Sequence, residues 1–458
     1  MFKKRAYHIH FVGIGGIGMS GIAELLLNLG YRVSGSDIRA TDITKRLESL
    51  GGTIFIGHAE NHVREAHVLV VSSAIKENNP EVIAARRTSI PVISRAEMLA
   101  ELMRLKYSIA VAGTHGKTST ASIIASILAA GELDPTIVIG GKLKSLGSNA
   151  FLGKGDFIVA EADESDGSFL KMSPTISVIT NIDLEHLDFY RGINDIKAAF
   201  QQFIDSVPFY GLSVLCLDCE SVQDVIPFLK KRFTTYGITS QADFQAKNIT
   251  FEGLQSYFTV YQNGTLLGDI RLNMPGLHNV YNSLAAIAVS IELEIDFSIV
   301  QETLNIVHGV QRRLEIKGEK QNITVIDDYA HHPTEVKATL SALKEAWPDR
   351  KLWVAFQPHR FSRTKMLFDD FARSFYQTDE LLLFPIYPAG EAPIQNISSD
   401  YLATAITARG HKNVTLVSSF EEAQKILTTQ LKTGDIFLTM GAGDIWKLGE
   451  QMLNVLDL

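Results

Sequence analysis

The chain repeats one local pattern: a short apolar run, a polar or glycine-rich turn, and then apolar residues spaced as on one face of a helix. The first copy is a strand over residues 7–12, a glycine turn and an apolar helix that ends at Gly30. A second strand follows over 32–37, and the alternation continues through 67–75 and 91–103. Alternating strands and helices form a parallel sheet covered by helices, so this pattern predicts a first doubly wound domain.

A second group of elements begins with a strand, a polar loop and a long apolar helix within residues 107–131. Further strands and one helix are predicted at 156–163, 175–183, 193–207 (the helix), 212–218 and 232–238. Between Phe244 and Met274 polar and apolar residues alternate, and Asn263-Gly264 is a strong hairpin signal. The pattern therefore predicts an antiparallel extension, which a helix over 277–293 closes.

The third group of elements opens near Val310 and again alternates strands with helices. Its apolar strands are predicted within 323–333, 351–359, 380–388, 413–419 and 435–444. The length of 458 residues agrees with three domains, because a domain takes roughly 150 residues. We therefore expect an α/β chain of three domains in series, with boundaries at 1–106, 107–309 and 310–458.

Composition narrows the class of protein. Hydrophobic residues make up 46% and charged residues 21%, which is typical of a globular protein and excludes a disordered chain. The 43 basic and 51 acidic residues give a net charge of −8, which argues against binding nucleic acid by bulk charge. No apolar run reaches the roughly 18 residues that span a bilayer, and the start of the chain is unlike a signal peptide. We expect a cytoplasmic protein without a membrane segment, as a monomer or homodimer.

The two cysteines, Cys216 and Cys219, have the C-x-x-C spacing of metal and redox motifs. A structural zinc site needs four ligands, and the sequence has no second pair. A thioredoxin-like motif stays open, but two incidental thiols in a reducing compartment are the favoured interpretation.

A glycine-rich loop follows the first strand, with Gly13, Gly15 and Gly18 in the G-x-G-x-x-G spacing. Such a loop lets the backbone approach a pyrophosphate at a helix N-terminus, and Asp37 ends the next strand. The pattern favours a Rossmann-like dinucleotide-binding domain. Another diphosphate, such as a nucleotide sugar, and tight packing without a ligand remain alternatives.

The second loop, Gly113-Thr114-His115-Gly116-Lys117-Thr118, lies between an apolar strand and a helix, as a phosphate-binding loop should. Its backbone would cradle phosphates, Lys117 would reach the β and γ oxygens, and Thr118 would ligate Mg²⁺. The loop is a shortened variant, because Val111 occupies the first glycine position of the full motif. It predicts a central domain that resembles a P-loop ATPase.

Acidic residues and a histidine follow two further strands of the central domain. Glu161 ends one strand, and Asp163, Glu164 and Asp166 come close behind, most of them expected in a solvated loop. His186 follows another strand, and its place downstream of a phosphate loop favours a ligand over a structural residue.

In the third domain, candidate residues lie just beyond two strand ends, where α/β sheets bind ligands. One segment holds Asp327, Asp328, Tyr329, His331 and His332, and the other holds His359, Arg360 and Arg363. The forked donors of the arginines suit carboxylate or phosphate oxygens, although they could also be surface charges at a helix start.

Taken in order, these segments resemble the Mur ligase family over nearly the whole chain. The motifs are HFVGIGGIGMSGIAE, AGTHGKTST, VAEADESDGSFL, TNIDLEHLDFY, GLHNVYNS, GVQRRLE, DDYAHHPTE and QPHRFSR. The resemblance implies a Rossmann-like N-terminal domain, a P-loop ATPase-like central domain with an antiparallel β extension, and a Rossmann-like C-terminal domain. It also implies that the domains bind, in that order, a UDP-sugar, ATP and an amino acid.

The resemblance assigns roles to matching residues. The diphosphate of a UDP-sugar would contact Gly13, Gly15, Gly16 and Gly18. The candidates for its uridine and sugar are Asp37, Ser72 and Ser73. ATP would contact Gly113, Thr114, His115, Gly116, Lys117, Thr118, Ser119, Asn279, Asn282, Arg313, Asp328 and His331. Mg²⁺ would be held by Thr118, Glu161 and His186. The amino acid would contact Tyr329, His359, Arg360 and Arg363, and the catalytic set would be Lys117, His186, His359 and Arg360.

The activity that the resemblance implies is ATP-dependent joining of L-alanine to the lactyl carboxylate of UDP-N-acetylmuramate, through an acyl phosphate, in peptidoglycan synthesis. A ligase that recycles murein tripeptide onto the same nucleotide sugar is the nearest alternative. A nicotinamide-dependent oxidoreductase would use the first glycine loop but leaves the second unexplained. A non-catalytic nucleotide sensor would use both loops without turnover.

Overall fold

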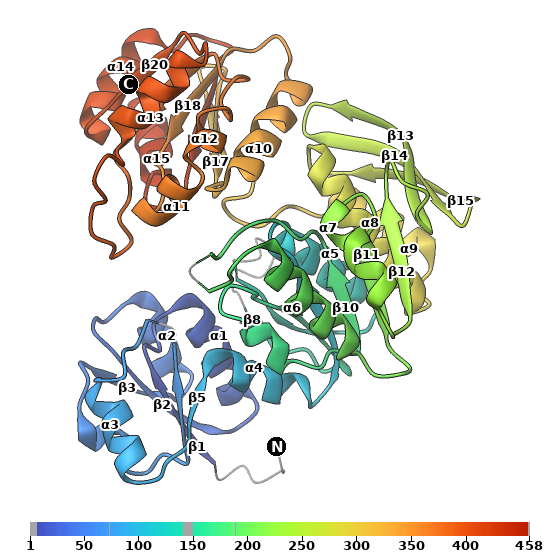
Figure 1. The fold of residues 1–458 in the computed structure, drawn as a ribbon, viewed down its shortest axis with the longest axis vertical. Helices are drawn as coiled ribbons and strands as arrows, with labels where there is room; N and C mark the ends of the chain where they lie inside the picture. Colours follow the sequence, from blue (N-terminus) through green and yellow to red (C-terminus); the bar gives the residue numbers. More distant parts are fainter. Residues whose placement is uncertain (1–6, 73, 141–149, 188, 457–458) are drawn as a thin grey trace. The chain divides into compact units, whose positions relative to one another are not determined.

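A computed structural model describes residues 7–72, 74–140, 150–187 and 189–456 (Figure 1). These residues form three β-sheets and divide into two compact units. The first unit is Met1–Lys247, Thr259–Ile270 and Tyr281–Val307, and the second is Asn248–Phe258, Arg271–Val280 and His308–Leu458. Among the described helices, none combines the length and the apolar content needed to cross a bilayer.

The first sheet has five parallel strands in the order β3-β2-β1-β4-β5. The strands are β1 (His8–Val12), β2 (Arg32–Asp37), β3 (Thr53–Ile56), β4 (Val68–Val71) and β5 (Val92–Ser94). The helices are α1 (Ile17–Asn28), α2 (Asp42–Ser49), α3 (Pro80–Arg87) and α4 (Arg95–Met103), with a short 3₁₀ helix η1 (Glu60–Val63). The strand order reverses between β1 and β4, which creates the crevice where open α/β sheets bind ligands.

The central sheet has ten strands in the order β15-β14-β13-β12-β11-β10-β6-β9-β7-β8. In chain order, the first six strands of this sheet are β6 (Tyr107–Ala112), β7 (Thr136–Val138), β8 (Ala150–Phe151), β9 (Phe157–Glu161), β10 (Ile176–Ile179) and β11 (Leu212–Cys216). The last four are β12 (Phe233–Gly237), β13 (Phe244–Glu252), β14 (Gln255–Gln262) and β15 (Thr265–Leu272). β6 lies between β9 and β10 and runs parallel to both, so the phosphate-loop candidate leaves the middle of the sheet.

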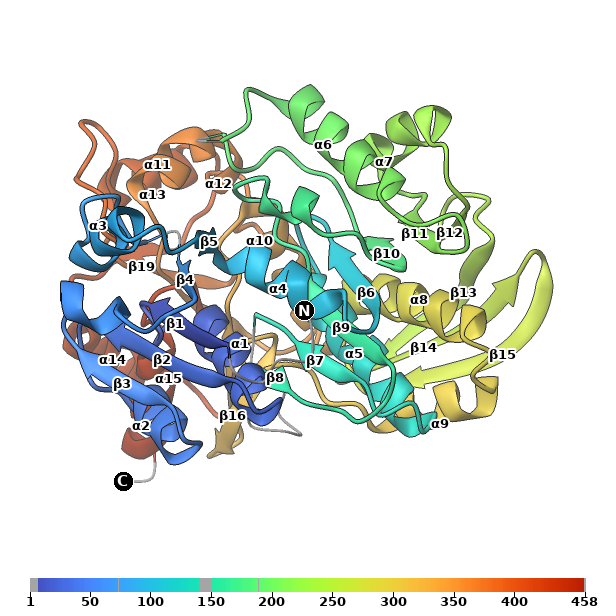
Figure 2. The ribbon, with the colours of Figure 1, turned by 90° about the horizontal axis from the view of Figure 1, so that it is seen from below.

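The helices of this region are α5 (Lys117–Ala130), α6 (Ile193–Asp205), α7 (Glu220–Val225), α8 (Leu277–Glu292) and α9 (Phe297–Ile306), with 3₁₀ helices η2 (Ser168–Lys171) and η3 (Ile226–Phe228). Two-residue turns join β13, β14 and β15, the strands that extend the sheet (Figure 2). At the second turn, Asn263 and Gly264 have φ of 49° and 80°, as a type I′ hairpin requires. The antiparallel extension is therefore confirmed, although β13 begins by pairing with β12 in parallel.

The third sheet has six strands in the order β16-β17-β21-β18-β19-β20, of which only β16 is antiparallel to its neighbour. The strands are β16 (Glu315–Lys320), β17 (Ile323–Asp328), β18 (Leu352–Phe356), β19 (Glu380–Leu383), β20 (Val414–Leu416) and β21 (Ile436–Met440). The helices are α10 (Pro333–Ala346), α11 (Phe361–Met366), α12 (Phe368–Phe371), α13 (Ser399–Ala408), α14 (Phe420–Gln430) and α15 (Trp446–Val455).

Strand alternation explains how this sheet is buried on both faces. Leu352, Val354 and Phe356 of β18 pack with residues of α10, α12 and α13, whereas Trp353 and Ala355 pack with α14 and α15. Successive side chains of a strand point to opposite faces, so an uninterrupted apolar run such as LWVAF needs helices on both sides. The three-domain α/β architecture predicted from the sequence is confirmed.

The first and central sheets share one apolar core. A single cluster of buried residues runs from Ile9 and Phe11 of β1 through Met98 of α4 to Phe200 and Leu215 of the central region. The third sheet has its own two clusters. The described part of the first unit therefore holds two sheets around a common interior.

Candidate active site

The phosphate-loop candidate is a tight turn between β6 and α5 that only glycine can form at two positions. Gly113 has φ of 134°, and a Cβ atom there would lie 2.1 Å from Oγ1 of Thr180. Gly116, with φ of 83°, is the N-cap of α5, and its Cβ would lie 2.7 Å from Oδ1 of Asn282. Backbone strain and close neighbours both exclude a side chain, so the loop needs these glycines.

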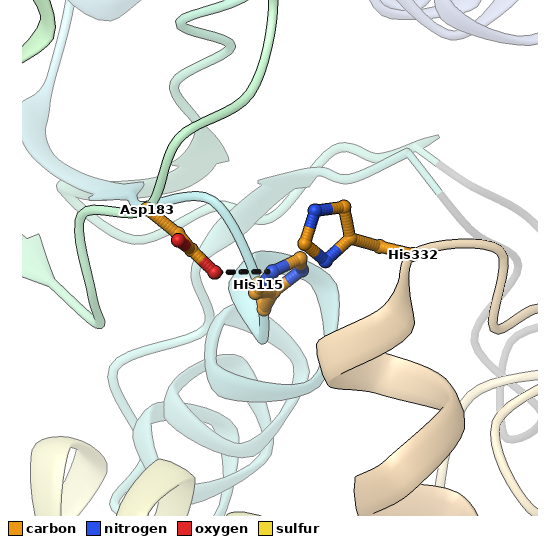
Figure 3. A group of neighbouring side chains, drawn as sticks. All are labelled: His115, Asp183 and His332. Carbon is orange, nitrogen blue, oxygen red and sulfur yellow. Dashed lines mark ion pairs between the residues drawn. The ribbon is translucent and has the colours of Figure 1, made fainter. Parts of the chain in front are cut away.

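The residues that follow β10 hold this loop in place. Asn181 Oδ1 accepts a hydrogen bond from the His115 backbone nitrogen at 2.9 Å, and its Nδ2 donates to the His115 carbonyl at 3.0 Å. Thr180 Oγ1 donates to the same carbonyl at 2.6 Å, and the Asp183 backbone nitrogen donates to Thr114 Oγ1 at 2.9 Å. The side chain of His115 also lies 3.7 Å, Nε2 to Oδ2, from Asp183 (Figure 3). These contacts hold the loop in place through protein groups alone.

Lys117, the first residue of α5, points back over the loop. Its Nζ donates to the Gly113 carbonyl at 2.6 Å and lies 2.9 Å from each carboxylate oxygen of Glu164. Burial alone would lower the pKa of Lys117, but the nearby carboxylates of Glu164, Asp163 and Glu161 raise it above the ordinary value. Lys117 is therefore a charged ammonium at neutral pH. The neighbouring Thr118 and Ser119 lie on the first turn of α5, where Ser119 is buried.

The acidic segment after β9 differs from the solvated loop expected for most of it, because Glu164 is only 2% exposed. The sequence analysis did not distinguish Glu164 from its acidic neighbours. Its position three residues after Glu161 was the one signal that could have suggested an inward-facing carboxylate. Glu161 Oε1 accepts a hydrogen bond from the Gly140 backbone nitrogen at 2.7 Å.

Asp163 pairs with Arg95 of α4 at 3.5 Å. Arg95 also flanks Gly18, since a Cβ on that glycine would lie 3.1 Å from Arg95 Cδ.

His186 lies beside the same carboxylate. Its Nε2 is 3.7 Å from Oε1 of Glu164 and 3.7 Å from Oε2 of Glu185, and its φ of 56° is unusual for a residue with a Cβ. The structure thus brings Lys117, Glu164 and His186 together, although these residues belong to three separate segments of the chain.

Helix α8 carries Asn279 and Asn282, two of the residues expected to contact ATP. Asn282 Oδ1 accepts a hydrogen bond from Thr120 of α5 at 3.0 Å, which joins the two helices beside Gly116. Asn279 Nδ2 donates to the Pro275 carbonyl at 2.7 Å in the turn that begins the helix. Both side chains are buried.

The first glycine loop is closed by the acidic residue that ends β2. Gly15 donates its backbone N–H to Asp37 Oδ2 at 2.9 Å, and a Cβ on Gly15 would lie 2.8 Å from that oxygen. Gly13 has φ of 80° and lies close to Ser72, while Gly16 is the N-cap of α1. Ser73 lies outside the described residues. The loop therefore presents backbone groups at a helix N-terminus, which suits a phosphate oxygen.

A buried polar network lies behind this loop. Glu81 of α3 is 0% exposed and accepts hydrogen bonds from Ser36 Oγ at 2.6 Å and from Nδ1 of His62 at 2.6 Å. His58 Nδ1 and His10 Nε2 lie 3.3 Å and 3.9 Å from its oxygens. The backbone carbonyl of Ser36 also accepts the N–H groups of Gly13 and Ile14, so the network supports the loop directly.

In the third domain, Asp328 ends β17 as a buried carboxylate. Its oxygens accept the backbone N–H groups of Leu314 at 2.7 Å and Ala330 at 2.8 Å. Burial raises the pKa of Asp328 to about 6, although the charge of Arg313 opposes that rise. Arg313 Nη1 lies 3.5 Å from Glu335 of α10, and its guanidinium lies 5.5 Å from the ring centroid of Tyr329.

A row of rings follows from Tyr329 across the ends of β17, β18 and β19. Ring centroids are 5.2 Å apart for Tyr329 and His331, 6.2 Å for His331 and His359, and 5.5 Å for His359 and Tyr387, which stack in parallel. Arg363 Nη1 lies 3.4 Å from Nδ1 of His359. Burial, together with the charges of His331, Arg363 and Arg360, lowers the pKa of His359 to about 4.

The neighbouring Arg360 has φ of 70°, a strained conformation that starts α11 directly after His359. Strain of this kind is concentrated at functional sites. Tyr387 was missed by the sequence analysis, because its parallel bridge to His359 joins two strand ends that only the sheet brings together.

The two thiols of the C-x-x-C segment are free cysteines, with Cys216 buried and Cys219 partly buried. Burial raises the pKa of Cys216 to about 12, and the hydrogen-bonding partner of the Cys219 thiol is the backbone of Ile182. A thiol with a raised pKa is a poor nucleophile, so two incidental thiols remain the favoured interpretation.

Two glycine loops at the carboxyl ends of parallel strands in two sheets, one with a partly buried lysine, define a nucleotide-binding α/β protein of the phosphate-loop type. The chain belongs to the Mur ligase family. Three models of that family match in order: the Mur ligase family, catalytic domain over residues 8–107, the Mur ligase middle domain over 111–290, and the Mur ligase, glutamate ligase domain over 312–443. The resemblance read from the motifs is therefore confirmed.

Individual relatives are similar over the full length. The UDP-N-acetylmuramate–L-alanine ligase of Desulfatibacillum aliphaticivorans is 62% identical over 453 residues, 99% of both chains. The crystal structure of a UDP-N-acetylmuramate–alanine ligase from Thermotoga maritima has a TM-score of 0.83 at 30% identity and covers 98% of this chain and 99% of its own. A murein peptide ligase from Psychrobacter arcticus has a TM-score of 0.72 at 27% identity, with 98% and 99% covered.

Proposed function

We propose that the chain joins L-alanine to the lactyl carboxylate of UDP-N-acetylmuramate, with conversion of ATP to ADP and phosphate, as a step of peptidoglycan synthesis. The observation that carries this proposal is the partly buried Lys117 over a glycine loop that protein contacts hold in place, in a chain 62% identical to an L-alanine ligase. A murein tripeptide ligase is the second candidate, and the lower similarity to the Psychrobacter arcticus protein makes it the less favoured one.

We further propose domain boundaries at 1–106, 107–309 and 310–458, and a cytoplasmic location, where both nucleotides occur.

ATP would bind at the loop between β6 and α5. The backbone of Gly113, Thr114, His115 and Gly116 would surround the phosphates, and Lys117 would contact their outer oxygens. Ser119, Asn279, Asn282, Arg313, Asp328 and His331 complete the proposed nucleotide contacts. Charged Lys117 supports this assignment, because an ammonium stabilises the negative charge that moves onto the bridging and γ oxygens during transfer.

Mg²⁺ is the expected metal. A hard cation prefers oxygen ligands and keeps substrate phosphates in its coordination sphere, and the hydroxyl of Thr118 and the carboxylate of Glu161 offer such oxygens, with His186 as the third proposed ligand. When bound, the ion would neutralise charge on the phosphate oxygens.

The diphosphate of UDP-N-acetylmuramate would bind at the first glycine loop, Gly13, Gly15, Gly16 and Gly18. Asp37, Ser72 and Ser73 are the proposed contacts for uridine and sugar. Because Asp37 already accepts the Gly15 N–H, we propose that it shapes the loop as well as contacting the ligand.

L-Alanine would bind in the third domain, near Tyr329, His359, Arg360 and Arg363. The arginines are the proposed partners of its carboxylate, because a guanidinium donates two parallel hydrogen bonds to a carboxylate. With a pKa of about 4, His359 is neutral at physiological pH and would orient the substrate rather than carry a proton.

The proposed reaction has two steps. The lactyl carboxylate attacks the γ-phosphorus and ADP leaves, which gives an acyl phosphate. The free amine of alanine then attacks the acyl carbon, and the amide forms as phosphate leaves and the amine gives up one proton, which balances as hydrogen phosphate. Lys117 and the arginines stabilise the negative charge on the reacting groups in both steps. Most of the rate acceleration would therefore come from positioning and charge stabilisation.

Phosphate release tests this function. The chain, incubated with UDP-N-acetylmuramate, ATP, Mg²⁺ and L-alanine, should release phosphate only when all four are present. Replacing L-alanine by the tripeptide L-alanyl-γ-D-glutamyl-meso-diaminopimelate should reduce the rate strongly. A faster rate with the tripeptide would establish the second candidate, and phosphate release without any amine acceptor would contradict both.

A further inference from the structure

Every donor of the Lys117 ammonium is already in use. An ammonium has three N–H donors, and the structure offers acceptors for all of them: the Gly113 carbonyl at 2.6 Å and the two Glu164 oxygens at 2.9 Å each. The Thr114 carbonyl lies further off, at 3.4 Å. A phosphate oxygen can therefore bind Lys117 only by displacing a group that is already there.

Glu164 is the group most easily displaced. The Gly113 carbonyl belongs to the loop backbone, whose position Thr180 and Asn181 fix, so it cannot withdraw without breaking the loop. Glu164 contacts Lys117 through a side chain, while its backbone carbonyl is held separately by Tyr190 Oη at 2.7 Å. Its carboxylate can turn away from Lys117 while the backbone stays in place.

We propose that Glu164 is a positioning residue that occupies Lys117 until nucleotide arrives, so that ATP binds by exchanging one anion for another on this lysine. The inference rests on the proposed nucleotide site and adds a competitor to it. In the nucleotide-free chain Glu164 keeps Lys117 aimed over the loop. On binding, its negative charge opposes the incoming phosphates until a cation compensates it.

The exchange predicts an unusual dependence of nucleotide affinity on metal. Without a divalent ion, the phosphates meet a buried carboxylate that has just lost its partner, and such a charge is costly to leave unpaired. With Mg²⁺ present, the added positive charge reduces this repulsion. Removing the carboxylate charge should therefore tighten metal-free binding much more than binding in the presence of Mg²⁺.

Calorimetric titration of ADP and ATP into the full chain tests the exchange, with EDTA in one series and Mg²⁺ in the other. Glu164→Gln keeps the size of the side chain and removes its charge. We expect it to tighten metal-free binding by about tenfold, because a hydrogen bond to a charged group is at stake. The affinity with Mg²⁺ should change much less. Asp166→Asn removes the same charge from the same loop, where the exposed Asp166 accepts the Ser168 backbone N–H, and should leave both affinities unchanged.

Glu164→Asp provides a second variant if the glutamine variant does not fold. Its shorter arm keeps the charge but withdraws the oxygens from Lys117, so metal-free binding should tighten by a smaller factor. Metal-free binding by these variants that is equal to or weaker than that of the unchanged chain would overturn the proposal. So would an equal gain with Asp166→Asn, which would indicate a general charge effect. These titrations need no alanine or UDP-sugar, so they remain valid even if the proposed ligation fails.

Discussion

The carboxylate of Glu81 lies 2.6 Å from Nδ1 of His62 in the core of the first domain, where Glu81 has no exposed surface. Burial alone would raise the pKa of Glu81, but interactions with His10, Ser36 and His62 lower it to about 2. A carboxyl group whose pKa is lowered in the folded state stabilises the fold at pH values above its unfolded pKa, near 4.5. This contribution is lost as the pH falls towards the folded pKa of about 2.

We therefore expect Glu81→Gln to lower the free energy of unfolding by about 3 kcal/mol at neutral pH. The difference in unfolding free energy between the variant and the wild-type protein should shrink as the pH falls below about 4.5. Glu81 is protonated first in the unfolded chain and only at lower pH in the folded chain, so its stabilising charge is lost over this range. Urea denaturation at several pH values measures this. A difference that stays constant down to about pH 3 would show that the charge of Glu81 is not what stabilises the network.

Replacing Gly113 by alanine should disrupt the phosphate loop. The added Cβ would lie 2.1 Å from Thr180 Oγ1 at a φ of 134°, so both packing and backbone oppose it. We expect a loss of more than about 2 kcal/mol in unfolding free energy and no measurable ATP binding.

Gly192 offers the matched control for this variant. A Cβ atom added there would have no neighbouring atom within 4 Å, and the φ of 163° is extended, so Gly192→Ala should change stability by less than about 0.5 kcal/mol. Similar losses in both variants would mean that steric contact at Gly113 is not the cause.

Replacing Gly15 by alanine tests the first loop. Its Cβ would lie 2.8 Å from Asp37 Oδ2 and would push that carboxylate off the Gly15 N–H. We expect KM for UDP-N-acetylmuramate to rise by about tenfold or more, while KM for ATP stays the same, since one charged hydrogen bond is lost at one loop only. Steady-state kinetics with each substrate varied in turn measures both values. A rise in KM for ATP alone would exclude this loop as the UDP-sugar site.

Lys117→Met should abolish ligation and also destabilise the chain, because Glu164 would remain buried without its cation. The expected loss of stability is about 3 kcal/mol. Adding Glu164→Gln to Lys117→Met should recover part of that stability but no activity. Thermal unfolding and phosphate release separate the two effects, and an inactive double variant no more stable than Lys117→Met would argue against the ion pair.

His359→Asn should weaken alanine binding without moving the pH profile. The pKa of His359 is about 4, so this histidine is already neutral from pH 6 to 8 and does not titrate there. We expect KM for L-alanine to rise by about tenfold, with the inflections of kcat/KM against pH unchanged. An inflection that disappears in the variant would instead identify His359 as the proton acceptor.

Several parts of this fold followed directly from the sequence. The apolar runs located strands such as β6 and β18, and the Asn263-Gly264 turn was recognised from two residues, because both signals are local. Glycine spacing located both loops for the same reason. The parallel start of β13 was not expected, since alternation describes a strand but not the direction of its neighbour.

The candidate site shows the opposite limit. Nothing in DESD distinguishes the inward-facing Glu164 from the exposed Asp166, because the difference arises from Lys117, which lies 47 residues earlier in the chain. Arg95 and Tyr387 were missed for the same reason, as each becomes part of a site only through a strand or helix packed from elsewhere. Motifs locate loops, whereas tertiary packing decides which side chains complete them.

Because the first and central sheets share an apolar core, we expect their two loops to be coupled thermodynamically. Elements that share an interior unfold together, so a ligand held by either loop stabilises the residues around both by mass action. A UDP-sugar and a nucleotide would then each raise the temperature of the same melting transition, even though each contacts a different sheet. In such a protein the first substrate to bind also protects the empty site of the second from local opening.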